Sequence, residues 1–508
     1  MMGLLSGYLF YVLLGANPSC SVLAESQNTT IVGLWVGTLK AGISDLRLGF
    51  EFKSTEQGSL IGKMTSIDQG GVSLPFTSVK FKDESLVVSI AFGTAKFTGK
   101  RSQGGELEGE FEQNGLKFPL KLVRVTKLPT ILRPQLPIKP YPYPTKEVTF
   151  KNETANSIFS GTLTLPMGQG PFPAVVLVSG SGPQDRDETL FQHKPFLVIA
   201  DHFARNGIAC LRYDDRGTGK STGNHSQATT LDFAKDAESA LQFLRLQTSI
   251  DPGRVGICGH SEGGLIGPLV AANQPEAVAF LILLAGPGIP GDRIIMKQML
   301  DYGQQVAGYE KELANKLEVA KRIIPIAKTA LTTKDSLAAM KACVLEFETE
   351  LGNTKTPADA YKPWEPMVKQ LSSPWMRCFL GHDPIPVLEK VRCPVLALNG
   401  AMDTQVVCPD NLPRIATAFS GSRANLLASR EFPKVNHLFQ HCETGFVNEY
   451  GLIEETFAPE ILEFMSQWVL DPHSLVLADP STKGRNCHLL KTRENLGNGL
   501  LPWRKKNR

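Results

Sequence analysis

Residues 256–264 read GICGHSEGG, and this stretch decides the fold. It surrounds one serine, Ser261, with glycine two residues before it and two residues after it. Apolar residues lead in from Val255. A strand that enters a helix through a very tight turn needs small residues on both sides of that turn. We therefore expect a strand, a sharp turn at Ser261 and a helix that starts near Glu262.

Length and composition indicate a globular protein of more than one domain. A chain of 508 residues is too long for one ordinary core, while 42% hydrophobic and 20% charged residues are usual values. The net charge is +3, but residues 474–508 carry eight Lys or Arg and two Asp or Glu, so this tail holds +6 and the rest −3. We interpret residues 473–508 as a basic, solvated C-terminal tail and expect no nucleic-acid partner, although contact with nucleic acid or anionic lipid is the alternative.

The first 24 residues are typical of a signal peptide. The apolar run of residues 3–16 is too short to span a bilayer, and Val22 and Ala24 are small residues at positions minus three and minus one of a cleavage site. The usual positive charge is missing, because no Lys or Arg precedes Lys40. Cys20 as a lipid-anchor residue is the weaker alternative. The sequence predicts an exported protein without a membrane span.

The nine cysteines show no paired spacing such as C-x-x-C. Buried free thiols are therefore a better interpretation than a disulfide framework. His437 and His441 have helical spacing but lack a nearby third ligand, and no H-E-x-x-H motif occurs. We expect no metal and no cofactor.

Residues 25–127 predict a small all-β domain. Apolar and polar residues alternate there, as in half-buried strands, and Asn114-Gly115 is a strong hairpin signal. About eight short strands suggest an antiparallel barrel or sandwich. Residues 128–145 follow as a linker, because they include six prolines and favour an extended chain. We interpret it as a spacer rather than as a ligand for a partner's groove.

Residues 146–472 predict an α/β domain. Its strand-like segments are continuous apolar runs, without alternation of apolar and polar residues. Such strands are covered on both faces and indicate a mostly parallel sheet with helices on both sides. Between about residues 289 and 385 the strand signal stops, and helical spacing predicts a cap inserted after a strand. The apolar runs are Ala174–Val178, Ile208–Tyr213, Val255–Cys258, Phe280–Leu284 and Val395–Leu398.

A serine hydroxyl needs a neighbouring base and a carboxylate that orients the base. Asp403 directly follows the strand of Val395–Leu398, and His437 lies on a loop after the strand-like run Asn425–Phe432. Asp410 and Asp383 are rival acids, but neither directly follows a strand. We predict a triad of Ser261, Asp403 and His437.

An oxyanion intermediate needs backbone N–H donors. One comes from the residue after the nucleophile, which is Glu262. The other comes from the loop SGSGPQDRDE, residues 179–188, where Ser181 is the predicted donor and the register is uncertain by one residue.

Several stretches together resemble the bacterial carboxylesterases of the EstD type, a branch of the α/β-hydrolase superfamily related to prolyl-oligopeptidase catalytic domains. The resemblance covers about residues 146–470 and implies an α/β-hydrolase fold and a small-molecule ester as substrate. The residues after the acid, 404–408, and the tail beyond Asp471 depart from the pattern. The stretches are SGSGPQDRDE, YDDRGTGKSTG, GHSEGGLIGPLVAA, AGPG, CPVLALNG and NHLFQ.

The sequence therefore predicts a serine hydrolase that cleaves carboxylic esters of short to medium acyl chain through an acyl-enzyme. A serine aminopeptidase or amidase with the same triad is the first alternative, and a non-catalytic binding module is the second. DDRGTGKST is not a nucleotide-binding loop, because Asp214 stands where that motif needs glycine. A dehalogenase would need a carboxylate at position 261.

Overall fold

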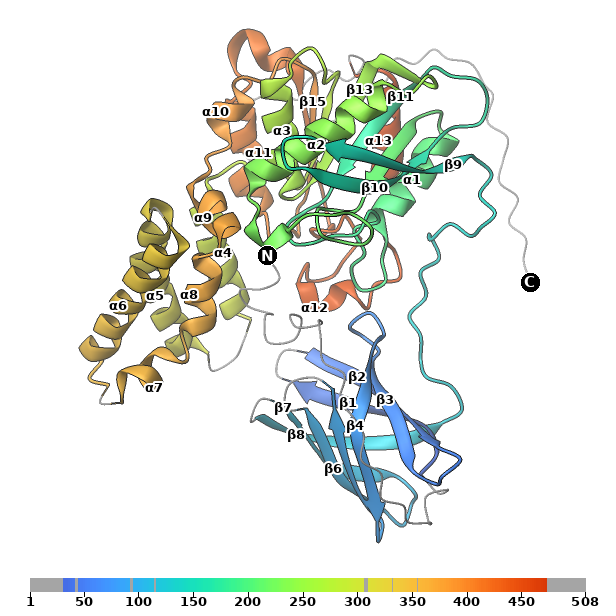
Figure 1. Ribbon diagram of the computed structural model, residues 1–508, viewed down its shortest axis with the longest axis vertical. Helices are drawn as coiled ribbons and strands as arrows, with labels where there is room; N and C mark the ends of the chain where they lie inside the picture. The colour runs from blue at the N-terminus through green and yellow to red at the C-terminus, as the bar shows by residue number, and fades with distance from the viewer. Residues whose placement is uncertain are drawn as a thin grey trace.

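The computed structural model describes residues 31–472 except 42–43, 92–94, 114–115, 306–308, 331 and 354. The predicted signal peptide, the basic tail and the Asn114-Gly115 pair lie outside the described residues. Figure 1 shows a barrel, an α/β domain and a helical cap.

The front domain is a closed antiparallel barrel. Its strands are joined in chain order, and β1 closes the barrel by pairing with β8 in the register Leu34↔Val125. The pairing Gln113↔Leu116 joins the strands on either side of the predicted hairpin. The strands are β1 (Gly33–Ala41), β2 (Ser44–Ser54), β3 (Leu60–Ser66), β4 (Val72–Lys82), β5 (Ser85–Ile90), β6 (Lys96–Arg101), β7 (Leu107–Gln113) and β8 (Leu116–Val125).

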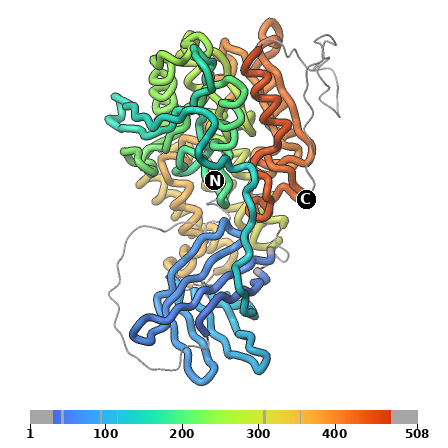
Figure 2. The backbone as a smooth tube through the Cα atoms, turned by 90° about the vertical axis from the view of Figure 1, so that its right-hand side faces the viewer, coloured from blue at the N-terminus to red at the C-terminus, as the bar shows by residue number. Residues whose placement is uncertain are grey.

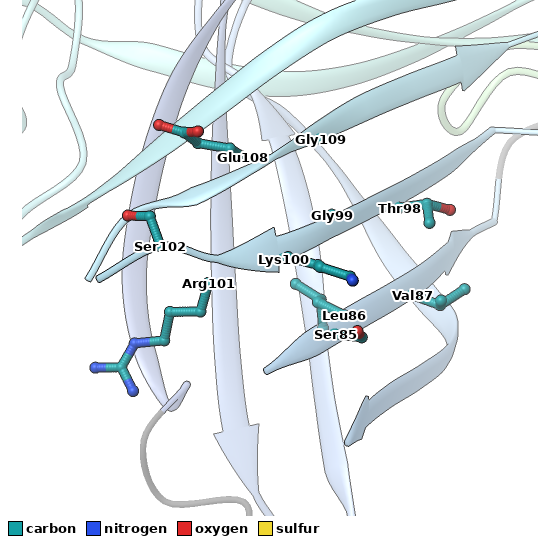
Figure 3. A pocket seen from close by; sticks show the side chains of 10 residues that line it. All are labelled: Ser85, Leu86, Val87, Thr98, Gly99, Lys100, Arg101, Ser102, Glu108 and Gly109. Atoms are coloured by element: carbon teal, nitrogen blue, oxygen red, sulfur yellow. The ribbon is translucent and has the colours of Figure 1, made fainter. Parts of the chain in front are cut away.

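Aromatic and aliphatic side chains fill the barrel. Trp35, Phe50 and Phe97 have no exposed surface, which is the inward half of the period-two pattern. A hollow of about 460 Å³ is lined by residues of β5, β6 and β7 (Figure 3). All its lining residues belong to the barrel and none to the α/β domain.

The α/β domain contains an eight-stranded sheet in the order β16-β15-β14-β13-β11-β12-β10-β9. Strands β11 to β16 are parallel to one another, while β10 pairs antiparallel with both β12 and the edge strand β9. The mostly parallel sheet is thus confirmed, with an antiparallel edge added. The strands are β9 (Thr145–Asn152), β10 (Ser157–Thr164), β11 (Phe172–Val178), β12 (Ala209–Tyr213), β13 (Ile250–His260), β14 (Leu281–Leu284), β15 (Val395–Gly400) and β16 (Leu427–Phe432).

Helices cover both faces of this sheet. Side chains of α1 (Pro195–Arg205) and α13 (Pro459–Leu470) share one apolar core with it. Those of α2 (Thr230–Arg245), α3 (Gly263–Asn273), α10 (Ile385–Leu388) and α11 (Cys408–Thr417) share the other. The strands are therefore buried on both sides, which explains their continuous apolar runs. None of the seven described cysteines forms a disulfide, and five of them are buried.

The cap is inserted between β14 and β15 and has its own apolar core. Ile294, Met299 and Ile324, which have helical spacing in the sequence, are buried in that core. Figure 1 shows α4 and α9 next to the α/β domain and the other cap helices farther from it. The cap helices are α4 (Gly291–Gly303), α5 (Glu310–Thr329), α6 (Thr333–Glu350), α7 (Pro357–Tyr361), α8 (Glu365–Leu371) and α9 (Pro374–Gly381).

The proline-rich segment is more than a spacer, because its polar side chains bind the α/β domain. Arg133 donates hydrogen bonds to the carbonyls of Gly451 (2.7 Å), Ile453 (2.8 Å) and Phe191 (2.9 Å). The Gln135 side chain bonds to the backbone of Phe457. The segment runs along one side of the molecule from the barrel to β9 (Figures 1 and 2).

Candidate active site

Ser261 lies on the predicted sharp turn. Strand β13 ends at His260 and α3 begins at Gly263, so only two residues connect them. Ser261 has a φ of 51°, in the left-handed region that few residues other than glycine adopt. Its N–H donates to the Leu284 carbonyl at 2.8 Å, at the end of the neighbouring strand. The backbone strain is thus held in place at the carboxyl end of the sheet, where ligands bind in folds of this type.

The two glycines beside the serine permit close packing of the backbone. A Cβ atom on residue 259 would lie 2.0 Å from the Gly263 carbonyl oxygen. One on residue 263 would lie 2.2 Å from the Val178 carbonyl oxygen. No side chain fits at these distances, so glycine is required at both positions for β13, α3 and β11 to meet.

Asp403 and His437 come together at the end of the next strands. The Nδ1 atom of His437 lies 2.8 Å from Oδ2 of Asp403, and the Asp403 side chain is completely buried. Its other oxygen accepts the N–H groups of Gln405 (2.8 Å) and Val406 (2.9 Å). Residues 404–408 depart from the family pattern, but their backbone still supplies the N–H donors that fix the carboxylate of Asp403.

The rival acids have other surroundings. Asp383 accepts the Ile385 N–H at 3.1 Å, and Asp410 is exposed in the first turn of α11. The structure thus brings together only Asp403, among these three carboxylates, with the predicted histidine.

A compact turn carries His437. Asn436 accepts the N–H groups of Leu438 (3.0 Å) and Gln440 (3.1 Å) on its side-chain oxygen and donates to the Gln440 side chain. Met402, next to the acid, donates its N–H to the Val435 carbonyl at 3.0 Å. The bond between Met402 and Val435 joins the loop of Asp403 to the loop of His437. The run NHLFQ follows β16, which begins at Leu427 because residues 421–426 form a short 3₁₀ helix instead of the expected start of the strand.

The loop after β11 holds the predicted oxyanion donor Ser181. Ser179 donates its hydroxyl to the half-buried carboxylate of Asp215 at 2.9 Å, and the Gln184 N–H donates to the same group at 2.9 Å. Burial raises the pKa of Asp215 well above its ordinary value. The N–H of Gly180 is occupied by the Glu188 side chain at 2.7 Å. The predicted donor, Ser181, is the next residue in this loop.

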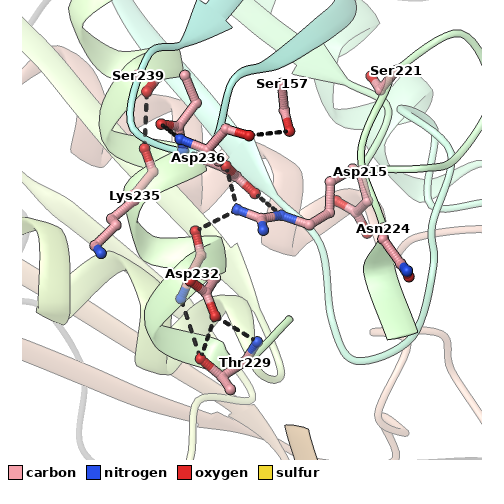
Figure 4. A network of polar contacts seen from close by, with 12 residues as sticks. Ser157, Asp215, Ser221, Asn224, Thr229, Asp232, Lys235, Asp236 and Ser239 are labelled. Carbon is pink, nitrogen blue, oxygen red and sulfur yellow. Dashed lines mark hydrogen bonds and ion pairs between the residues drawn. The ribbon is translucent and has the colours of Figure 1, made fainter. Parts of the chain in front are cut away.

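Ion pairs also stabilise the loop after β11 and the segment after β12. Arg186 pairs with Asp214 at 2.9 Å, directly beside Asp215 in the chain. Arg216 pairs with Asp236 of α2 at 2.6 Å and also donates to the Asp232 carbonyl. Figure 4 shows Asp232 and Asp236 within this polar network. The stretches SGSGPQDRDE and YDDRG are therefore bound to each other and to the start of α2.

Glu262 has a role that its sequence position does not reveal. Its carboxylate accepts the Thr230 hydroxyl at 2.6 Å and the Trp375 indole N–H at 2.7 Å. Burial raises the pKa of Glu262. Trp375 belongs to α9 of the cap, so the residue predicted as a backbone oxyanion donor also connects the cap to the α/β domain.

Two further residues near the serine escaped the sequence analysis. Nδ1 of His260 lies 2.9 Å from Oε1 of Glu188, and Nε2 of His260 lies 3.0 Å from the main-chain oxygen of His437. Both residues are inside the stretches that carry the family resemblance. No spacing rule connects them, because 72 residues separate them in the chain.

The geometry suits nucleophilic catalysis by a serine: a strained serine after β13 and a buried carboxylate–histidine pair after β15 and β16 lie at the carboxyl ends of the parallel strands. Among the described residues, no three His, Cys, Asp or Glu side chains gather as a metal site requires. No helix within the described ranges is both long and apolar enough to cross a bilayer.

Comparisons with known proteins agree with this fold. The profile of the family described as "Serine aminopeptidase, S33" matches residues 194–343. Esterase EstD of Thermotoga maritima is 35% identical over 174 residues, which are 34% of this chain and 41% of that protein. The alpha/beta hydrolase domain-containing protein WAV2 of Arabidopsis thaliana is 41% identical over 68 residues, 13% of this chain and 21% of that protein.

Solved structures are more distant. An esterase of Pyrococcus furiosus is 14% identical with a TM-score of 0.38, over 64% of this chain and 92% of that one. The chain spans less than half the length of the curated esterase that it matches. The α/β domain, with its elbow and sheet order, thus has the α/β-hydrolase fold, and part of its sequence is similar to Esterase EstD.

Proposed function

We propose that this chain is a serine hydrolase that cleaves carboxylic esters of short to medium acyl chain. The proposal rests on the contact of 2.8 Å between His437 and Asp403 and on the elbow at Ser261. His437 and Asp403 lie on the loops that follow two adjacent strands. The sequence similarity to an esterase supports an ester as the substrate.

In the proposed reaction, His437 removes the hydroxyl proton of Ser261 while the serine oxygen bonds to the acyl carbon. Backbone N–H groups of Ser181 and Glu262 stabilise the resulting oxyanion. The C–O bond to the alcohol then breaks, and the alkoxide takes the proton from His437. Water repeats the sequence on the acyl-enzyme, releasing the carboxylic acid and restoring Ser261. Asp403 holds the imidazole orientation and stabilises its charged form.

The cap supports the proposed preference in chain length. Two of its helices contact the site: α9 bonds to Glu262 through Trp375, and α4 bonds to the Gln405 carbonyl through Gln298 at 2.8 Å. Trp375 also stacks on Phe379, with ring centroids 5.5 Å apart. Aromatic rings next to the elbow favour acyl chains over charged groups. We expect kcat/KM to fall for long chains that the cap does not admit.

Replacing Ser261 with alanine tests the proposed nucleophile. Ser261→Ala should lower the hydrolysis of p-nitrophenyl butyrate by on the order of 10⁴-fold or more while the circular dichroism spectrum stays unchanged. A fluorophosphonate probe should label the wild-type protein on Ser261 and leave the variant unlabelled. Labelling of the variant would show that another residue is the nucleophile.

The aminopeptidase alternative has its own support, because the matching family is described as a serine aminopeptidase. Unblocked aminoacyl p-nitroanilides and matched p-nitrophenyl butyrate, assayed on one sample, separate the two functions. Faster turnover of the aminoacyl amides would replace the esterase proposal with an aminopeptidase. Absence of both activities and of labelling would favour a binding module.

A further inference from the structure

A second carboxylate–histidine pair lies directly beside the proposed triad. His260 precedes Ser261, and its ring centroid is 4.8 Å from that of His437. Glu188 and His260 are both buried, with exposed fractions of 5% and 7%. Neither residue has a step in the proposed reaction, so a buried pair in this position calls for another role.

The hydrogen bonds define the protonation of His260. The main-chain oxygen of His437 is only an acceptor, so Nε2 of His260 must carry the proton of the 3.0 Å bond. Burial alone would lower the pKa of His260, but the charge and hydrogen bond of Glu188 outweigh this effect and raise it. His260 therefore donates from Nε2 to the His437 carbonyl, while its Nδ1 faces the Glu188 carboxylate.

The same Glu188 oxygen also fixes the oxyanion loop. Oε1 accepts the Gly180 N–H at 2.7 Å as well as the His260 ring at 2.9 Å. Oε2 is buried without a hydrogen-bond partner. Glu188 itself has a φ of 51°, an unfavourable conformation that persists only where the surroundings hold it.

These contacts meet at the nucleophile. A Cβ atom on residue 180 would lie 3.2 Å from Cβ of Ser261 and 3.3 Å from Oε1 of Glu188. The charged and titratable groups that face His260 are Glu188 on the loop after β11, Asp403 after β15 and His437 after β16. One carboxylate oxygen thus connects the oxyanion loop, the elbow and, through His260, the loop of the catalytic base.

We propose that Glu188 and His260 are a pair of positioning residues that hold the backbones of Gly180 and His437 in register around Ser261. The inference rests on the proposed serine-hydrolase function. It concerns alignment, because neither side chain exchanges a proton with the substrate. A misplacement of about 1 Å in a catalytic group lowers the rate by on the order of 10²-fold.

Three substitutions of His260 separate its two hydrogen bonds. Glutamine keeps a donor near the position of Nε2, toward His437, and asparagine keeps one near Nδ1, toward Glu188. His260→Ala keeps neither. We expect kcat on p-nitrophenyl butyrate, per active site titrated with a fluorophosphonate, to fall about 100-fold in His260→Ala and His260→Asn but only about 10-fold in His260→Gln. KM should change less than about threefold.

Glu188→Gln tests the carboxylate, because the amide keeps the size of the side chain but removes the negative charge that faces Nδ1 of His260. Its kcat per titrated site should also fall about 10- to 100-fold. The double variant Glu188→Gln/His260→Ala should lose no more kcat than the single variant with the larger loss. Both residues act through one connection, so the two losses should not add. Glu463→Gln is the matched control, because His202 and Glu463 form another His–Glu contact at 3.8 Å, between α1 and α13.

A purely structural role would lower the melting temperature and the number of titratable sites but leave kcat per site unchanged, and that result would overturn the proposal. Additive losses in the double variant would overturn it as well. Failure of the proposed function has a different signature: the wild-type protein would show neither hydrolysis nor labelling of Ser261.

Discussion

Trp375 of the cap donates its indole N–H to the buried carboxylate of Glu262, the residue after Ser261, at 2.7 Å. Glu262 also accepts the Thr230 hydroxyl at the start of α2. The placement of α9 is therefore coupled to the backbone N–H that is proposed to stabilise the oxyanion. Movement of the cap at this point would move a group that the reaction needs.

Trp375→Phe should weaken this coupling. The variant keeps the aromatic ring but leaves the buried Glu262 carboxylate with one donor fewer, which costs about 1–2 kcal/mol in free energy of unfolding. We expect kcat/KM for p-nitrophenyl butyrate to fall about 10-fold. Trp364→Phe is the matched control, because Trp364 donates to Glu348 at 2.6 Å within the cap. An equal loss of kcat/KM in both variants would show that the Glu262 contact has no special role.

Asp403→Asn should lower kcat by on the order of 10⁴-fold, because the amide cannot stabilise a charged imidazole and favours the wrong tautomer. The fold should persist, since the side-chain oxygen can still accept the two backbone N–H groups after the acid. Asp410→Asn changes the rival acid on the surface of α11 and should retain full activity. Steady-state kinetics of both variants decide between the two aspartates; loss of activity in the Asp410 variant alone would reassign the acid.

His193 should make stability depend on pH. It is buried between Thr456 and the Tyr450 carbonyl, each at 2.9 Å, and burial lowers its pKa to about 4. The unfolded chain binds a proton below about pH 6.5, whereas the folded protein does so only near pH 4. The stabilisation from neutral His193 is therefore complete above pH 6.5 and is lost as pH falls toward 4.

Urea unfolding of His193→Gln checks this sign. The variant loses hydrogen bonds at every pH, so it should be less stable than wild type at pH 7.5. At pH 5 the difference should shrink by about 1–2 kcal/mol, because the variant has no histidine to protonate on unfolding. A difference that is constant, or larger at pH 5, would contradict the low pKa of His193.

Much of the fold follows from local patterns in the sequence. The runs at 174–178 and 395–398 lie within β11 and β15, and eight alternating segments form the barrel. The sequence did not predict the antiparallel hairpin of β9 and β10, which pairs Phe150 with Phe159. Strand β9 lies at the edge of the sheet and is mostly exposed, so it lacks the continuous apolar run of the inner strands.

The candidate site was predictable only in part. The prediction of Ser261, Asp403 and His437 rests on strand ends, and the structure brings Asp403 and His437 into contact at 2.8 Å. Glu188, His260 and Trp375 act through contacts that join distant loops, and no local pattern encodes which loop tips will meet. The same reason explains why Arg133 was read as part of a spacer: its partners lie 58, 318 and 320 residues away.

The close contact between the barrel and the α/β domain limits which front domains this hydrolase can carry. The main chains of Asp68, in the turn after β3, and of Gly451, after α12 (Val447–Tyr450), approach so closely that a Cβ atom on residue 451 would lie 2.2 Å from the Asp68 oxygen. Arg133 donates hydrogen bonds to the carbonyls of Gly451 and Ile453 in the same stretch of chain. The front module is therefore not freely exchangeable: a foreign barrel grafted onto this hydrolase would need a turn that fits closely against Gly451, and the segment that joins it to β9 would need to keep Arg133.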